Sequence, residues 1–372
     1  MSWAKKILIL LILTASLLSC KKSTENIIWE RSYGTGKAAF IRSSGDTGFV
    51  SCGTLGGKEY LLVVDNNGNK ISDYKSERDG LLTSAWTGDG YYIMTGATGG
   101  KMFISEISFN GTVLYDTIFN SSFTVEHSTI CYLGTGSFIA VGSADPDSSY
   151  KNTTGVSFVK FDGSSSTITI TQKTDSVYSS FVAMREAVTD NSGNLYLAMT
   201  RSFSGAKMKA EVSKYNSDFQ KLWEKELYNN PAYSAASLGI MIDDGDNPIV
   251  VGRTELPVST GVENNTFVAR YFFQGDSIQK EYLEYANSGS SVMSDGTGEF
   301  MVLNMNCLIV DIMNQNIKVA GIIRMYSSCD SQTTDAFGYS MALTKDGNII
   351  MAGSKGNGYY IVVKSSAALS PV

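Results

Sequence analysis

The sequence predicts an all-β protein, a seven-bladed β-propeller built from four-stranded antiparallel blades. A pattern of strands and tight turns returns after roughly 40–55 residues, which is the length of one propeller blade. The 372 residues contain 36 Gly and only 5 Pro, a composition typical of short strands joined by glycine turns. No long segment after residue 20 shows the periodicity of an amphipathic helix.

Each repeat begins with a strand, a tight turn and a second strand that ends at a small residue. In the first repeat the turn is residues 45–48 and the second strand is residues 49–54. Gly and Asn in such turns supply the positive φ angle that tight hairpins require. Similar turns follow at residues 88–90, 134–136, 190–193, 243–246, 295–298 and 345–348.

The second half of each repeat is a third strand, another turn and a polar outer strand. In the first repeat these are residues 60–65, 66–69 and 70–74. This later turn recurs at residues 109–111, 161–163, 215–217 and 274–275, with residues 314–316 as a degenerate copy. Because both families of turns keep the same order, the sequence favours seven blades. Six blades with a degenerate sixth repeat is the alternative.

The two ends of the repeat region complement each other. The seventh repeat stops after its third strand, residues 359–364, and so lacks an outer strand. Residues 27–33 match the outer strand of the fourth repeat, residues 221–227. We therefore expect an N-terminal strand, with Ile28 and Trp29 buried, to complete the last blade and close the ring. The predicted single domain is residues 27–366, followed by a C-terminal tail of residues 367–372.

The first 19 residues resemble a bacterial lipoprotein signal peptide. Lys5 and Lys6 precede an apolar run from Ile7 to Leu13, which is shorter than the roughly 20 residues of a membrane span. The sequence Leu17-Leu18-Ser19-Cys20 resembles a lipobox. This resemblance implies that Cys20 is the lipidated N-terminus, that residues 20–26 are a tether, and that the membrane is a partner through the lipid.

Charge and cysteine content narrow the function classes. The chain has 30 basic and 36 acidic residues; without residues 1–19 it loses Lys5 and Lys6, and its formal charge becomes 28 − 36 = −8. Nucleic acid is therefore excluded as a partner.

Among the later cysteines we expect Cys52 and Cys131 to be buried thiols in apolar strands. Cys307 and Cys329 flank one strand pair and are candidates for a disulfide.

The repeats also resemble the propeller lipoproteins of Bacteroidota. The resemblance is carried by second strands such as Ile93-Met94-Thr95-Gly96 and Met351-Ala352-Gly353-Ser354, and by Lys21-Lys22 after Cys20. It implies a propeller fold and an outer-membrane location, and it transfers no functional residues. In that lineage an Asp-(Ser/Thr)-aliphatic motif marks O-glycosylation, which here would fall on Thr117, Ser176 and Ser277.

Few residues suggest catalysis or metal binding. His127 is the only histidine, and we expect it to face solvent or to lie at the rim of the channel. Asp243, Asp244 and Asp246 place three carboxylates together and are a weak calcium candidate. They also occupy an ordinary repeat turn, which is the favoured interpretation. No cofactor is expected.

Two long connections are the candidate binding sites, because recognition usually resides in variable loops on a rigid scaffold. Residues 145–152 and residues 255–265 join the second and third strands of the third and fifth repeats. Both would lie on the face opposite the short turns. The candidate binding residues are Asp145, Asp147, Tyr150, Lys151, Glu255, Glu263 and Asn264.

The sequence therefore favours a non-catalytic, lipid-anchored docking subunit of the outer membrane, with an envelope protein or a glycan as its partner. The leaflet that it faces is left open. The alternative is an extracytoplasmic glycan hydrolase. That alternative requires two carboxylates about 5–10 Å apart in a pocket at the channel mouth.

Overall fold

The computed structural model describes residues 27–44, 48–134, 136–145, 155–162, 169–175, 181–202, 207–228, 232–258, 261–272, 276–283, 288–294, 298–305, 309–324, 336–356 and 358–366. Every regular element in these residues is a β-strand, which confirms the all-β prediction. Within them, no helix is long and apolar enough to cross a membrane. The predicted signal peptide, Cys20, the tether and the C-terminal tail lie outside the described residues.

Twenty of the strands form five four-stranded antiparallel sheets. The first two sheets are β5 (Leu81–Thr87), β6 (Tyr91–Thr98), β7 (Lys101–Ser108), β8 (Val113–Phe119), and β9 (His127–Gly134), β10 (Ser137–Ser143), β11 (Val156–Asp162), β12 (Thr169–Asp175). The third and fourth are β13 (Phe181–Thr189), β14 (Leu195–Ser202), β15 (Lys209–Tyr215), β16 (Lys221–Tyr228), and β17 (Ala235–Ile242), β18 (Pro248–Val258), β19 (Gly261–Phe272), β20 (Ser277–Leu283). The fifth is β21 (Gly289–Ser294), β22 (Phe300–Asn304), β23 (Ile309–Met313) and β24 (Val319–Arg324).

The other seven strands form one sheet in the order β25-β26-β27-β1-β2-β3-β4. Their bounds are β25 (Ala336–Leu343), β26 (Ile349–Lys355), β27 (Tyr359–Ser365), β1 (Ile27–Ser43), β2 (Phe49–Leu55), β3 (Lys58–Val64) and β4 (Lys70–Asp79). The long strand β1 changes its partner midway. Its first part, from Ile27 to Thr35, pairs with β27, and its second part, from Gly36 to Ser43, pairs with β2.

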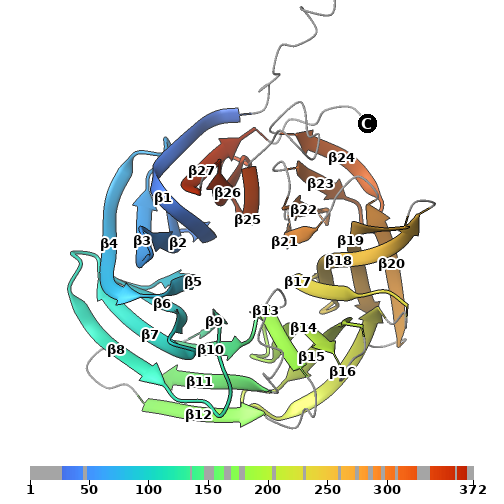
Figure 1. Cartoon of the computed structure of the whole chain (residues 1–372), viewed down its shortest axis with the longest axis horizontal. Coiled ribbons are helices and arrows are strands. Elements are labelled where there is room, and N and C mark those ends of the chain that lie inside the picture. The colour runs from blue at the N-terminus through green and yellow to red at the C-terminus, as the bar shows by residue number, and fades with distance from the viewer. Residues whose placement is uncertain are drawn as a thin grey trace, which may run out of the picture.

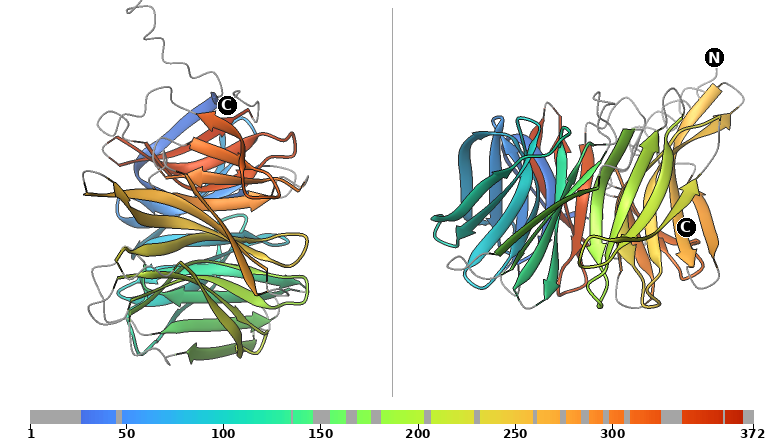
Figure 2. Two further views of the ribbon diagram at one scale, coloured as in Figure 1. Left: turned by 90° about the vertical axis from the view of Figure 1, so that its right-hand side faces the viewer. Right: turned by 90° about the horizontal axis from the view of Figure 1, so that it is seen from below.

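The sheets stand around a common centre (Figure 1), and their strands run between the two faces of the ring (Figure 2). In each four-stranded sheet the first strand is innermost and the fourth is outermost. Since neighbouring strands are antiparallel, the connections alternate between the faces. We call the side with the first-to-second and third-to-fourth connections the turn face. The side with the second-to-third connections and the crossings between sheets is the loop face.

Seven turns on the turn face share one five-residue geometry. In the turn from Asp65 to Asn69, the Asp65 carboxylate accepts hydrogen bonds from the N–H groups of Asn67 and Asn69, each 2.8 Å long. The fourth residue of the turn, Gly68, has a φ of 76°. Six other turns share two features: the side chain of the first residue accepts a hydrogen bond from the N–H of the fifth, and the fourth residue has a positive φ. These turns begin at Ser108, Asp190, Asn216, Asp243, Asn314 and Thr344. These turns confirm the repeat that the sequence predicts.

The small residue at the end of the second strand also has a structural cause. A Cβ atom on Gly353 would lie 1.9 Å from the carbonyl oxygen of Phe337 on the innermost strand. Equivalent glycines press against the neighbouring innermost strand at Gly53, Gly96 and Gly252. Only glycine permits this close approach of two backbones.

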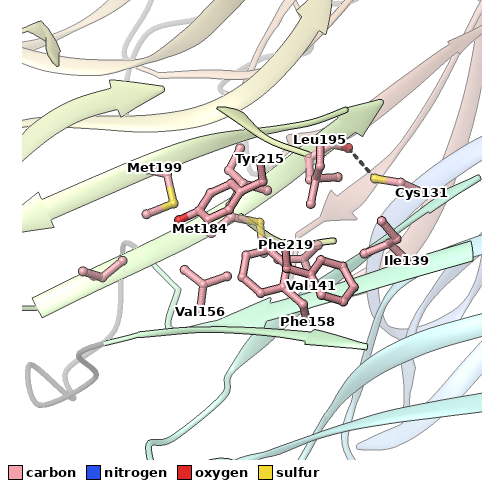
Figure 3. Close-up of a cluster of buried hydrophobic side chains, with 13 residues drawn as sticks. Cys131, Ile139, Val141, Val156, Phe158, Met184, Leu195, Met199, Tyr215 and Phe219 are labelled. Atoms are coloured by element: carbon pink, nitrogen blue, oxygen red, sulfur yellow. Dashed lines mark hydrogen bonds between the residues drawn. The ribbon is translucent and has the colours of Figure 1, made fainter. Parts of the chain in front are cut away.

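Apolar side chains fill the spaces between neighbouring sheets. Figure 3 shows the cluster between the β9–β12 and β13–β16 sheets, which includes Val141, Phe158 and Leu195. In the same cluster, the Cys131 thiol donates a hydrogen bond of 3.2 Å to the Ala187 carbonyl oxygen. Cys52 and Cys131 are both buried free thiols, as predicted. Cys307 and Cys329 lie outside the described residues.

The first part of β1 buries one of the two residues expected to be buried. Trp29 is 9% exposed, packs in the cluster that contains Tyr360, and donates a hydrogen bond of 3.0 Å to the Asn66 carbonyl oxygen. Ile28 is 51% exposed, so the prediction that it is buried is wrong. The reason is a β-bulge: Ile27 pairs with Ser365 and Trp29 with Lys364, so Ile28 has no partner on β27 and its side chain turns outward.

Candidate functional site

The innermost strands meet around a small cavity at the centre of the ring. Its volume is about 30 Å³, and β1, β5, β9, β13, β17, β21 and β25 all contribute residues to its wall. Such a volume holds one or two water-sized particles. The side chains of the innermost strands therefore leave little free space at this level of the axis.

Six of the seven innermost strands carry a β-bulge at the same level. In each of them, one residue is left without a partner on the second strand, and that residue lines the cavity. Bulges redirect side chains in this way at functional sites. The six bulge residues are Ala39, Thr83, Arg185, Leu238, Ser290 and Tyr339.

The residue that follows the bulge commonly ties one innermost strand to the next. The Ser84 hydroxyl accepts a hydrogen bond from the Ile130 N–H, and the Ser340 hydroxyl accepts one from the Ile41 N–H, each 3.2 Å long. These contacts satisfy backbone groups that face the axis and have no strand partner there. A hydroxyl at this position is thus part of the scaffold.

The β13 strand departs from this pattern with a charged pair. Arg185 is the only charged bulge residue, and Glu186 takes the place of the serine. Its carboxylate accepts a hydrogen bond of 3.0 Å from the Ile240 N–H. Burial raises the pKa of Glu186 to about 7, while this hydrogen bond and the charges of Arg42 and Arg185 act in the opposite direction. Arg185 and Glu186 are the strongest functional candidates at the centre of the ring.

Arg42 carries a second guanidinium group. On β1 it follows the cavity-lining residue Phe40 by two positions, toward the turn face. The Arg42 guanidinium lies 4.2 Å from the Trp86 ring centre and 5.6 Å from that of Phe40. Burial lowers the pKa of Arg42, and Glu186 is among the groups that act against this effect. The Nη1 atom of Arg42 is buried and has no hydrogen-bond partner among the described residues.

His127 lies at the loop-face end of the same cavity. It is 8% exposed, so of the two expected positions the solvent-facing one is wrong, whereas a position at the rim of the channel agrees with the structure. Its Nδ1 atom is 3.9 Å from Oδ2 of Asp145. Burial lowers the pKa of His127 to about 4, partly offset by Asp145, so the imidazole is neutral at pH 7. The structure thus brings one predicted binding residue, Asp145, beside the only histidine.

The cavity does not contain the paired carboxylates that the hydrolase alternative requires. Glu186 is the only carboxylate among the described residues that line it. A sugar ring also needs far more room than one or two water molecules.

The predicted loop at residues 255–265 is largely a β-hairpin. β18 and β19 stay paired up to Val258 and Gly261, so only residues 259–260 lie outside the described residues. The loop prediction is therefore wrong for this segment. A buried strand shows in the sequence as a pattern of apolar residues. These two strands are held together by backbone hydrogen bonds instead, which leave no such pattern. Glu263 and Asn264 are exposed on this hairpin.

Glu255, at the base of the hairpin, is already engaged. Its carboxylate accepts a hydrogen bond of 3.0 Å from the Ser234 N–H and lies 3.1 Å from the Lys207 Nζ atom. The hydrogen bond from Ser234 is the main reason that the pKa of Glu255 is lowered. Glu255 therefore positions the hairpin against the preceding sheet.

At the weak calcium candidate, the side chain of Arg270 already pairs with the first of the three carboxylates, Asp243. Asp243 is paired with Arg270, whose Nε atom lies 2.6 Å from Oδ2, and its other oxygen caps the turn. Within the described residues, no group of three His, Cys, Asp or Glu side chains is arranged to hold a metal ion. Asp244 and Asp246 are exposed on the same turn.

The remaining candidates are scattered. Thr117 is half-buried on β8, and Ser277 is exposed at the start of β20. Ser176, Asp147, Tyr150 and Lys151 lie outside the described residues. O-glycosylation therefore stays a prediction.

Sequence reasoning missed Arg42, Arg185 and Glu186. Aligning the seven repeats on the innermost strand would have shown a signal, because Met184-Arg185-Glu186 stands where β5 has Leu82-Thr83-Ser84. These two positions are uncharged on the other bulged strands, so a charged pair marks a departure from pure scaffold.

Comparisons with known proteins establish the fold. No protein-family model matches the sequence, and no curated protein is similar to it. The Pan2 WD40 domain of Neurospora crassa superposes with a TM-score of 0.60 at 11% identity, covering 90% of each chain. The Dos1 propeller gives a TM-score of 0.57 at 8% identity, with 94% of this chain and 97% of that chain covered. YCF48 bound to D1 peptide gives 0.57 at 9% identity, with 91% and 97% covered. The chain has a β-propeller fold.

Proposed function

We propose that this protein is a non-catalytic docking subunit of the cell envelope, anchored to the outer membrane through a lipid on Cys20, that binds a protein partner on its loop face. The observation that carries the proposal is the β18–β19 hairpin, which projects from the face opposite the predicted anchor. The following paragraphs give the support for each part.

The scaffold in this proposal is a closed ring of seven blades. The seven-stranded sheet counts as two blades that share β1, since the two parts of β1 pair with different strands. Seven innermost strands also line the central cavity. The first part of β1 acts as the outer strand of the last blade and covers an edge of β27 that would otherwise be open.

The start of β1 sets the orientation of the ring. Ile27 pairs with Ser365, at the end of β27 where the other sheets carry a third-to-fourth turn. The chain therefore enters the ring at the turn face. A tether of residues 20–26 spans at most about 25 Å. With Cys20 in the membrane, the turn face lies toward the lipid and the loop face points away from it.

The loop face carries the features suited to a partner. The β18–β19 ladder continues for four residue pairs beyond the Thr254–Asn265 pair, a projection of roughly 13 Å. In contrast, β2 and β3 join through Gly56 and Gly57 directly after the Leu55–Lys58 pair. Asp145 and His127 lie at the loop-face end of the central cavity. YCF48 is a propeller with a bound peptide, so a peptide segment is a partner compatible with this fold.

Cys20→Ala is expected to abolish lipidation, because the thiol that carries the lipid is absent. The protein should then either leave the membrane fraction or remain as a precursor with its signal segment uncleaved. Fractionation and mass measurement of the N-terminus test this expectation. Several acyl chains hold a protein firmly at the membrane, whereas a protein without acyl chains has no such anchor. Equal membrane recovery of the variant and the wild type, with an unmodified N-terminus in both, would disprove the anchor.

Shortening the hairpin is expected to abolish partner capture without unfolding the protein. The design replaces residues 256–263 by Gly-Gly and keeps Glu255 with its contacts to Ser234 and Lys207. It copies the Gly56-Gly57 connection of the first blade. Stability should change by about 1 kcal/mol or less, because a shorter closed loop costs little entropy. Pull-downs from detergent-solubilised membranes measure the capture.

A turn-face variant serves as the control. Asp346→Asn changes an exposed turn residue on the opposite side of the ring and should leave capture unchanged. If the turn-face variant loses the partner while the shortened hairpin retains it, the face assignment is wrong. Loss of a hydrolytic activity toward a glycan on changing Glu186 would favour the hydrolase alternative instead.

A further inference from the structure

The end of the β18–β19 hairpin stands apart from the strands that flank it. Among the described residues, β17 pairs with β18 no further than Thr254, and β20 pairs with β19 no further than Thr266. β18 and β19 nevertheless stay paired with each other up to Val258 and Gly261. Residues 255–264 therefore form a two-stranded extension beyond the body of the blade, which we call the ribbon.

The pairing within the ribbon determines which backbone groups point outward. In an antiparallel pair, residues that bond to each other alternate with residues whose N–H and C=O groups point away from the partner strand. The Glu255 N–H donates a hydrogen bond of 2.9 Å to the Ser234 carbonyl oxygen, so Glu255 and its partner Asn264 do not bond to each other. The N–H and C=O groups of Asn264, and of Val262 two residues before it, therefore point away from β18.

The outer edge of β18 is protected against further pairing. Besides the N–H of Glu255, its carboxylate is engaged, because it accepts a hydrogen bond of 3.0 Å from the Ser234 N–H. The next outward position on β18 is Pro257, which has no N–H to donate. Contacts with neighbouring loops and proline residues are common means by which proteins keep an edge strand from pairing with another chain.

The outer edge of β19 lacks this protection. The outward N–H and C=O groups of Asn264 make no hydrogen bond with any described residue, and β19 contains no proline. Glu263 and Asn264 are exposed, and the Glu263 carboxylate forms no ion pair with a described residue. An extended segment beside these residues would continue the sheet at the point where β20 ends.

We propose that the β19 edge of the ribbon captures the partner by strand addition: an extended segment of the partner pairs with Val262 and Asn264 and places a Lys or Arg side chain beside Glu263. In this mode of recognition the backbone hydrogen bonds give affinity, and neighbouring side chains select the sequence. A basic side chain directly opposite Glu263 forms a favourable cross-strand pair. The inference rests on the docking proposal, because it names the chemistry of the segment that the hairpin binds.

A second copy of this chain fits the edge less well than a basic segment does. Antiparallel pairing of two β19 edges through Val262 and Asn264 would set the Glu263 side chains of both copies opposite each other. Like charges in that position destabilise a pair of strands. The whole chain carries a formal charge of −6, so two copies also repel each other. The occupant is therefore a segment of another protein.

Asn264→Pro tests the proposal through the backbone. The substitution removes an outward N–H and leaves the ladder with β18 intact, since Asn264 does not bond to β18. Pro257 shows that the ribbon accepts proline at an outward position. Pull-downs from detergent-solubilised membranes with the full mature protein should show a large loss of partner for Asn264→Pro and none for Asn264→Ala, which keeps the N–H. Equal capture by the two variants would overturn strand addition.

Amide hydrogen exchange resolved to single residues measures the same edge directly. In the free protein the amide of Asn264 should exchange much faster than that of Glu263, which bonds to β18. In the complex isolated from the membranes, exchange of the Asn264 amide should become slow. A protected Asn264 amide in the free protein, or no change in the complex, would contradict the proposal. These exchange rates decide the question if Asn264→Pro fails to fold.

The possible outcomes separate strand addition from the docking proposal. If the shortened hairpin loses the partner while Asn264→Pro retains it, the hairpin is the docking site and strand addition is wrong. If the wild type captures no protein, both proposals fail. A dimer of the wild type that disappears in Asn264→Pro would assign the edge to a second copy of this chain and would overturn the partner segment.

Discussion

A protein that keeps Cys20 but lacks residues 21–35 is expected to lose its cooperative unfolding transition and to aggregate. The deletion removes the part of β1 that pairs with β27. It exposes one edge of the strand from Tyr359 to Ser365, which is apolar and ready to pair with another chain. Denaturant unfolding followed by tryptophan fluorescence, together with size-exclusion chromatography, measures both effects.

Two point variants separate packing from pairing within this strand. Trp29→Ala should lower the free energy of unfolding by about 3–5 kcal/mol, because a large buried side chain is lost. Ile28→Ala should change it by no more than about 0.5 kcal/mol, since Ile28 is 51% exposed. Equal stability of Trp29→Ala and wild type would show that the first part of β1 does not hold the ring closed.

Gly353→Ala is the second variant expected to have a large effect. The new Cβ atom would lie 1.9 Å from the Phe337 carbonyl oxygen and 3.0 Å from its carbonyl carbon. Both atoms belong to the backbone of the innermost strand, so relief requires a shift of β25 or β26. We expect a loss of about 3 kcal/mol in the free energy of unfolding, at the upper end for overpacking.

Gly347→Ala, in the turn between the same two strands, is the matched control. Its Cβ would meet nothing within 4 Å, but its φ is 75°. A left-handed conformation costs an L-residue about 1–2 kcal/mol. Chemical denaturation of both variants should therefore show the larger loss for Gly353→Ala. The opposite order would mean that the repeated glycine serves the turn conformation and not the close approach of strands.

The scaffold was predictable from sequence because its rules are local. The cap from Asp65 to Asn69 and the glycine at position 353 each depend on residues close in sequence or on a single strand pair. The match between the first residues of β1 and an outer strand likewise placed the N-terminal pairing with β27. Repetition made each of these signals visible several times.

The central cavity was not predictable, because its wall depends on residues from distant repeats. Thr83, Arg185 and Ser290 come to one cavity only when the sheets stand around a common centre, and a β-bulge shifts the register by one residue without a sequence mark of its own. The β18–β19 hairpin was missed for a different reason. Glu255, Pro257 and Gly261 are typical of loops, yet backbone pairing extends to the tip.

The central claim is that a partner docks on the loop face while the turn face lies toward the membrane. A photo-crosslinking amino acid at position 263, exposed on the hairpin, should give a discrete protein adduct in intact membranes. The same amino acid at position 67, exposed on the turn from Asp65 to Asn69, should give none. An adduct from position 67 together with no adduct from position 263 would contradict the account.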